Sequence, residues 1–322
     1  MKRLFLAALL LAAALGPNAA PSRAWRPFGE PSDGKVRPIQ ELNDANKPAE
    51  VIAALTPAYI QSLRGTDLRQ AYVLMGDNLD RLGRTGEALG YYQVGVSLFP
   101  KNVDLLTRQA ALLHRNGMDE QAKPLFLTAL QYEPRHWSAH MGLAEIDRRL
   151  GFLDRAADHY EIALEAVDTR ADVWRDYAQV LIALHEGATA DLALRKALAL
   201  DARSPDARIL MAYARRQQGD LDGAADQLDA ALDLGAGIGA RRAKALVRLE
   251  AGRLDEARRE AETVLKEAPG DGAALWVIAR ARLAAGDAAG AASDLASIKS
   301  SEGRNIFAAS AARVLRDRIL AR

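Results

Sequence analysis

Apolar residues along most of this chain recur at the spacing of one face of an α-helix. From about residue 69 they fall at positions i, i+3, i+4 and i+7 within each segment, and the arrangement returns at a period of 34 residues. One position of this period carries Gly83, Gly117, Gly151, His185, Gly219, Gly252 and Gly286. The period predicts a repeated pair of helices, in which the glycine follows the first helix and takes the left-handed conformation that glycine adopts most easily.

Small residues form two further columns of the repeat. The column seven residues before the marker contains Gly76, Ala110, Ala144, Ala178, Ala212, Ala245 and Ala279, and the column five residues after it contains Ala88, Ala122, Ala156, Ala190, Ala224, Ala257 and Ala291. We expect both columns where two helices cross, because larger side chains would force the helices apart. A third column, predicted to fill the space between one pair and the next, holds Tyr92, Phe126, Tyr160, Leu194, Leu228, Ala261 and Leu295.

Two units show the whole pattern most clearly. One reads Tyr72, Met75, Gly76, Leu79, Ala88, Tyr92 and Pro100, and the other reads Trp174, Tyr177, Ala178, Leu181, Ala190, Leu194 and Ala197. The chain therefore resembles the tetratricopeptide repeat family, whose motif has the form W-x2-L-G-x2-Y, A-x3-F and P. The resemblance implies an all-α fold, a right-handed superhelical solenoid of about seven helix-turn-helix repeats beginning at residues 69, 103, 137, 171, 205, 238 and 272. Later units depart from the motif, since Arg208, Arg241 and Lys244 occupy positions where the family has apolar residues.

Amphipathic segments flank the seven units. Residues 48–68 resemble a leading half-unit, so that the predicted solenoid covers 48–303. Residues 304–322 combine apolar positions with Arg and Asp on the opposite face, which predicts a C-terminal capping helix.

The N-terminus has the features of an export signal. Lys2 and Arg3 precede an apolar run of twelve residues, Leu4 to Leu15, which is short for a membrane span of about 20 residues. Residues 1–24 are therefore predicted to be a cleaved signal peptide, with an uncleaved anchor as the alternative. Residues 25–47 carry Pro, Gly and Asp without any period and are predicted to be a linker or extended arm.

Composition narrows the functional classes. The 43 basic and 42 acidic residues give a net charge of +1, which argues against a dedicated nucleic-acid binder. The absence of cysteine excludes disulfides, thiolate zinc sites, cysteine nucleophiles and a lipidated N-terminal cysteine. After the N-terminal run, no apolar segment approaches spanning length, so we expect an exported protein, periplasmic or secreted, without a transmembrane span in the mature chain.

The sequence offers few candidates for catalysis or metal binding. His136 and His140 have a spacing that could place two metal ligands on one helix face, but His136 falls at a unit boundary and no third ligand is evident. His185 begins an HExxH-like string that ends in Thr189. The glycines at 235, 237 and 239 do not complete G-x-G-x-x-G. We therefore expect no enzyme activity, no catalytic residue, no cofactor and no metal.

A solenoid of this family presents an extended concave surface, lined mostly by side chains of the first helices. Carried over to this sequence, the resemblance gives a partner-binding groove that includes Asp77, Glu145, Arg148, Arg175, Gln179, Tyr213, Arg216, Trp276 and Arg280. Arginine suits carboxylates, so a protein or peptide partner with an acidic segment is expected. The alternative is that these residues are ordinary solvated helix faces.

The resulting hypothesis is a non-catalytic scaffold for protein–protein interaction in a bacterial envelope. Its expected role is that of an adaptor for a secretion, polysaccharide-export or envelope-assembly machine. The alternatives are a periplasmic module that binds glycan or peptidoglycan, and a catalytic protein whose site the sequence does not reveal.

Overall fold

The computed structural model describes residues 34–298, and every regular element within that range is an α-helix. The described residues belong to two compact units, 34–163 and 164–298. The predicted signal peptide (1–24) and capping helix (304–322) lie outside the described residues. Among residues 34–298, no helix combines the length and the apolar character that crossing a bilayer requires.

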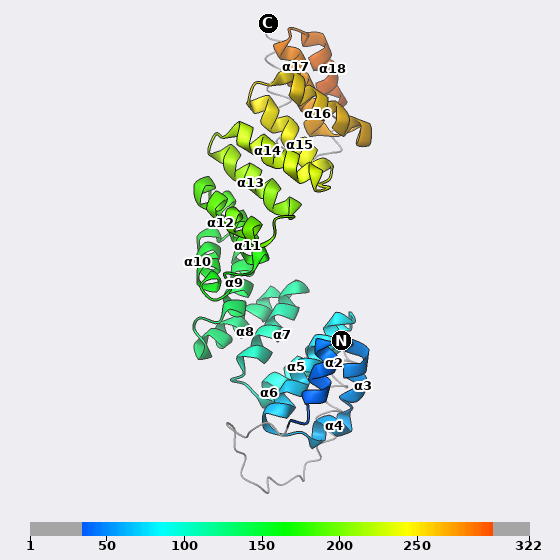
Figure 1. Ribbon diagram of the computed structural model, residues 1–322, viewed down its shortest axis with the longest axis vertical. Helices are drawn as coiled ribbons and strands as arrows, with labels where there is room; N and C mark the ends of the chain where they lie inside the picture. Colours follow the sequence, from blue (N-terminus) through cyan, green and yellow to red (C-terminus); the bar gives the residue numbers. More distant parts are fainter. Residues whose placement is uncertain (1–33, 299–322) are drawn as a thin grey trace. The chain divides into compact units, whose positions relative to one another are not determined.

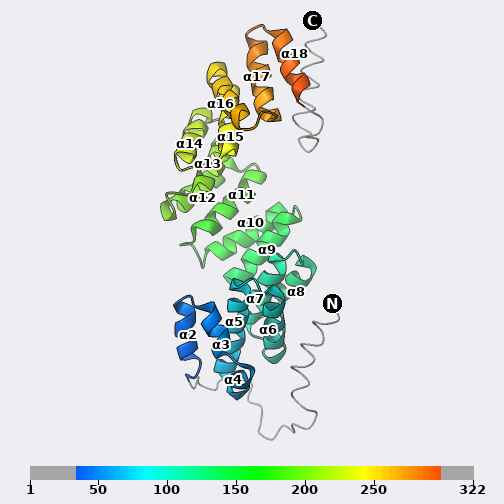
Figure 2. The same ribbon diagram turned by 90° about the vertical axis from the view of Figure 1, so that its right-hand side faces the viewer.

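The first unit contains nine of the helices. They are α2 (Arg37–Asp44), α3 (Pro48–Ala54), α4 (Pro57–Ser62), α5 (Gly65–Arg81), α6 (Thr85–Leu98), α7 (Val103–Arg115), α8 (Asp119–Tyr132), α9 (Trp137–Arg149) and α10 (Leu153–Leu164), the last of which reaches the boundary between the units. From α5 to α9, each helix packs against the next in the chain (Figures 1 and 2). The turns between paired helices are short, as in antiparallel helical hairpins.

The second unit continues the same alternation. It contains α11 (Ala171–Ala183), α12 (Gly187–Leu200), α13 (Pro205–Gln217), α14 (Leu221–Asp233), α15 (Ile238–Glu250), α16 (Leu254–Glu267), α17 (Gly272–Ala284) and α18 (Ala288–Ser297). Each of these helices contacts its successor, and α11 contacts α13 just as α15 contacts α17. This consecutive packing of helix pairs is the arrangement of an α-solenoid.

The marker column has the predicted backbone conformation. All six glycines have a positive φ, between 72° at Gly83 and 86° at Gly286. His185, at the seventh position, has a φ of 64°, although a side chain disfavours that region. Its neighbour Glu186 donates its N–H to Leu181 O (2.8 Å), so the helix end is closed around the histidine as it is around the glycines.

The small-residue columns lie in the core, as predicted. All seven alanines from Ala88 to Ala291 are fully buried, and the column from Ala110 to Ala279 is no more than 1% exposed. At Gly76, a Cβ atom would lie 2.3 Å from the ring of Tyr92. The large residue of the third column thus occupies the space that the small residue leaves.

The N-terminal part of the described chain corrects the predicted linker. Within 25–47, residues Arg37–Asp44 form α2, and Val36 and Ile39 are buried in the core that α5 also joins. The prediction was wrong for this segment because a helix of eight residues is too short to display a period. The predicted half-unit is divided as well, because Thr56 caps a new helix that starts at Pro57, and α5 begins at Gly65 rather than at residue 69.

Candidate partner-binding surface

Two acidic residues of the predicted groove are hydrogen-bonded within the first unit. Asp77, on α5, accepts hydrogen bonds from Tyr92 Oη (2.5 Å) and from Arg108 Nη1 (2.7 and 2.8 Å). Burial of the phenol, together with the carboxylate it donates to, raises the pKa of Tyr92. Tyr92 therefore remains a hydrogen-bond donor, and Asp77 joins its own second helix, α6, to the neighbouring α7.

Glu145 has the same arrangement two 34-residue repeats further along the chain. It accepts hydrogen bonds from the hydroxyl of Tyr160, on α10, and from Arg148 Nη2 (2.7 Å). Burial opposes ionisation of Glu145, but these hydrogen bonds outweigh it and lower the pKa of the carboxyl group. In the repeat between them, the same two positions are Ala111 and Phe126, which have neither the carboxylate nor the hydroxyl.

The first unit has a polar hollow of about 280 Å³ on its first-helix side. The ion pairs Asp77–Arg108 (2.7 Å) and Asp80–Arg115 cross it from α5 to α7. Trp137 and His136 contribute stacked rings at the start of α9. Most of the charge in this hollow is therefore neutralised within the protein.

The arginines predicted to receive an acidic partner have carboxylates of the chain beside them. In the first unit Arg148 pairs with Glu145 (2.7 Å). In the second unit Arg175 pairs with Asp176 (3.0 Å). Arg216 holds Glu250 with two hydrogen bonds, 2.6 Å from Nε and 2.5 Å from Nη2, and these raise the pKa of its guanidinium against the smaller effect of burial.

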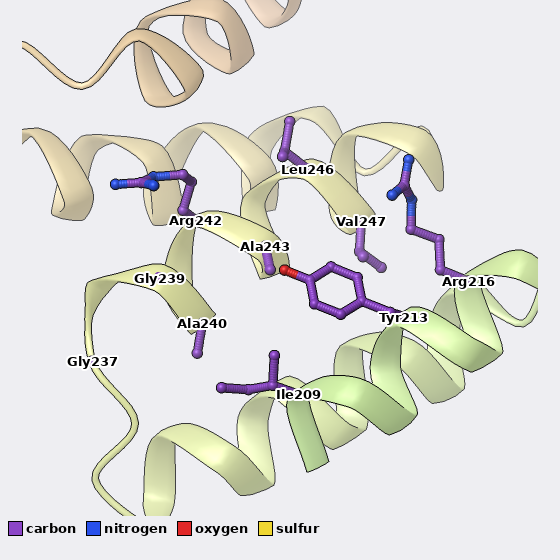
Figure 3. A pocket seen from close by; sticks show the side chains of 10 residues that line it. All are labelled: Ile209, Tyr213, Arg216, Gly237, Gly239, Ala240, Arg242, Ala243, Leu246 and Val247. Atoms are coloured by element: carbon purple, nitrogen blue, oxygen red, sulfur yellow. The ribbon is translucent and has the colours of Figure 1, made fainter. Parts of the chain in front are cut away.

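A second hollow, of about 350 Å³, lies between α13 and α15 in the second unit (Figure 3). Tyr213 projects into it from α13 beside Ile209 and is 38% exposed. The α15 side is formed by Ala240, Ala243, Leu246 and Val247, among other residues. In Figure 3, Arg242 and Arg216 stand at the two ends of this space, and each is ion-paired, Arg242 with Asp271 (2.5 Å) and Arg216 with Glu250.

Small residues on α15 account for this hollow. Gly239, Ala240 and Ala243 face α13 with little side-chain volume, and a Cβ atom on Gly239 would meet nothing within 4 Å. The preceding turn carries Gly235 and Gly237, and the repeat that begins at residue 205 is one residue shorter than the repeats before it. An exposed tyrosine beside apolar surface and open space is the arrangement expected of an interaction site.

The remaining predicted residues lie elsewhere on the second unit. Gln179 is exposed on α11. Arg280 lies over the ring of Trp276 one turn away on α17, with Cζ 5.7 Å from the ring centroid. Trp276 is half-buried against Ala279 and Leu295, so part of its ring belongs to the hydrophobic core.

Neither of the sequence-level metal candidates forms a cluster. His136 stacks on Trp137, whereas His140 contacts His159 of α10. Among residues 34–298, no group of three or more His, Cys, Asp or Glu side chains is arranged to hold a metal ion.

Comparison with known proteins identifies the repeat. A family model described as tetratricopeptide repeat matches residues 120–172 and 242–302. These two segments of the chain carry tetratricopeptide repeats. Tetratricopeptide repeat proteins generally act as non-catalytic scaffolds that bind protein or peptide partners.

Individual relatives share the repeat rather than the whole protein. Tetratricopeptide repeat protein 8 of Caenorhabditis elegans is 22% identical over 197 residues, which is 50% of this chain and 39% of the relative. The structure of pilF from Pseudomonas aeruginosa has a TM-score of 0.55 at 16% identity, covering 64% of this chain and 94% of pilF. YrrB, described as a tetratricopeptide repeat protein with an unusual peptide-binding site, has a TM-score of 0.53 at 19% identity, covering 57% of this chain and 95% of YrrB. These similarities establish the fold.

Sequence reasoning had placed Tyr213 in the groove but missed the hollow that makes it accessible. The signal was present, because Gly237 and Gly239 stand where the other repeats carry larger residues. It had also missed that Asp77 and Glu145 each come with a tyrosine fifteen residues later.

Proposed function

We propose that this tetratricopeptide repeat protein is a non-catalytic scaffold that anchors a protein partner in the hollow between α13 and α15. The observation that carries the proposal is the hollow itself. It offers about 350 Å³ beside Tyr213, Ile209 and the apolar residues of α15, on the first-helix side of the unit. An apolar side chain of an extended segment fits such a site, and tyrosine is among the residues enriched at the centres of interfaces.

An apolar anchor accounts for the surface better than an acidic one. A carboxylate of the partner would have to replace Glu250 on Arg216, Asp176 on Arg175 or Glu145 on Arg148. Such an exchange replaces one ion pair with another and gains little free energy. Acidic residues of a partner would therefore contribute little to binding, even beside Arg216 and Arg242 at the ends of the hollow.

The setting that we propose is a bacterial envelope, where the protein would serve as an adaptor in a secretion, export or assembly machine. Support comes from the charged and apolar N-terminal pattern of residues 1–24. Fusing residues 1–30 to a reporter enzyme that is active only outside the cytoplasm tests this setting. Activity that is lost when Leu9 and Leu10 are replaced by Arg supports export, whereas an inactive fusion contradicts it.

Site-specific photocrosslinking tests the hollow in the cells that make the protein. Tyr213 is replaced by benzoylphenylalanine, and in a control Tyr132, which is 43% exposed on α8, is replaced in the same way. We expect position 213 to give a discrete protein adduct that disappears when Gly239→Leu is added. Identical adducts from both positions, or adducts from position 132 alone, would contradict the proposal.

A glycan-binding role is the second candidate, and the polar hollow of the first unit favours it. Trp137 lies there beside Ser138 and Asp104, a combination of aromatic and polar groups that suits a sugar ring. Soluble peptidoglycan fragments that bind the protein, and that lose binding with Trp137→Ala but not with Gly239→Leu, would favour this role over the first.

A further inference from the structure

Two histidines meet inside the first unit without any role in the partner-binding surface. Nδ1 of His140, on α9, lies 2.9 Å from Nδ1 of His159, on α10. His140 is 5% exposed, and its Nε2 lies 2.9 Å from the carbonyl oxygen of Pro134. On the other side of the pair, Nε2 of His159 is 3.9 Å from the carboxylate of Asp147, which is fully buried.

We propose that His140 and His159 form a proton-binding site that makes the pairing of α9 with α10 sensitive to acid. The hydrogen positions follow from the contacts. A carbonyl oxygen only accepts, so Nε2 of His140 carries hydrogen and donates to Pro134. In neutral His140, Nδ1 is then an acceptor, and Nδ1 of His159 is the donor across the 2.9 Å contact.

The first added proton is compatible with this geometry. It enters at Nε2 of His159, which faces Asp147, and it leaves the hydrogen bond between the two rings in place. A second proton has no such position, because Nδ1 of His140 would then present hydrogen to the hydrogen on Nδ1 of His159. Two cationic rings in contact repel each other, so the doubly protonated pair separates.

Other charged groups around the pair limit how easily it binds protons. Asp147 is also approached by Arg155 of α10 (2.9 Å) and by Lys123 of α8 (3.5 Å), and these cations offset much of its attraction for a protonated His159. Asp158, also on α10, makes a smaller electrostatic contribution that favours the proton. Burial, reinforced by His140, lowers the pKa of His159 below its ordinary value of 6.5.

The sign of the effect on stability follows from this lowered pKa. As the pH falls below 6.5, the unfolded chain binds a proton at this residue before the folded chain does. The stability that neutral His159 contributes is therefore complete above pH 6.5 and is lost as the pH falls towards the pKa of the folded protein. Acid therefore weakens the contact between α9 and α10, which the two rings join.

Nuclear magnetic resonance of the imidazole nitrogens tests the site in the unaltered protein. At about pH 7.5 we expect His140 in the Nε2–H form and His159 in the Nδ1–H form, which is the less common tautomer of histidine. Acid should then shift the signals of both rings together. Finding both rings as Nε2–H tautomers, each titrating independently of the other, would overturn the proposal.

A variant without the second ring provides a separate measurement. In His159→Gln, the amide can still donate to Nδ1 of His140 but does not titrate. Between about pH 7 and 5, its loss of stability in urea unfolding should be roughly half that of the parent or less. His185→Asn, which removes an exposed histidine, should follow the parent. Equal losses in parent and His159→Gln would show that the pair does not sense acid.

Discussion

At the residue scale, the paired tyrosines and carboxylates show where sequence reasoning succeeds and where it stops. The columns predicted that Tyr92 and Tyr160 lie between helix pairs, and both are buried. They did not predict that Asp77 and Glu145 would be used by those tyrosines rather than by a partner. A carboxylate on the first helix can point to solvent or to its second helix, and the choice depends on whether a hydrogen-bond donor stands opposite. At Ala111 and Phe126 neither the carboxylate nor the donor is present.

This pairing makes a prediction about Tyr160. Its hydroxyl donates to a charged carboxylate, and such hydrogen bonds contribute about 1.5–3 kcal/mol. Tyr160→Phe should therefore lower the free energy of urea unfolding by that order, while the same change in a protein already carrying Glu145→Ala should cost much less. Tyr132→Phe, at an exposed site, should change stability by less than about 0.5 kcal/mol. Additive effects of the two changes at 145 and 160 would contradict the pairing.

At the scale of helices, the period predicts where the helices lie, because each repeat needs a glycine in its turn and alanines where its helices cross. The helices α7, α9, α11, α13, α15 and α17 begin at residues 103, 137, 171, 205, 238 and 272. Two features could not be predicted from the period. The helix α2 has no repeat partner, and Lys244, which stands where the family has leucine, is satisfied by Glu260 (2.6 Å) and Asp229 (2.5 Å) from α16 and α14. Ion pairs between helices leave no periodic signal in one sequence.

The turn between α11 and α12 gives a prediction at this scale. His185 has a φ of 64°, which costs a non-glycine residue about 1–2 kcal/mol, whereas glycine pays mainly in the entropy of the unfolded chain. His185→Gly should therefore stabilise the protein by about 0.5–1 kcal/mol, measured by urea unfolding. The reciprocal change Gly151→His, at a φ of 82°, should destabilise it. A loss of stability in His185→Gly would show that the imidazole has a structural role that outweighs the backbone strain.

At the scale of the whole molecule, the two units carry surfaces of different chemistry on the same kind of scaffold. The first unit's hollow is crossed by ion pairs, whereas the second unit's hollow is largely apolar and holds an exposed tyrosine. The family resemblance predicted a groove but not its character, because the hollow depends on small residues at Gly239, Ala240 and Ala243 and on a shortened unit. The central claim is therefore that the second unit anchors the partner.

The most direct test of that claim is an affinity ratio. Peptides selected from a displayed random library on the parent protein are measured by fluorescence polarisation against the parent, Gly239→Leu and Gly90→Leu. Both substitutions add a side chain at a helical glycine whose Cβ would meet nothing within 4 Å, but only the first fills the hollow. We predict at least about a tenfold loss of affinity in Gly239→Leu, equivalent to about 1.4 kcal/mol, with affinity unchanged in Gly90→Leu. Peptides that bind Gly239→Leu as tightly as the parent would contradict the account.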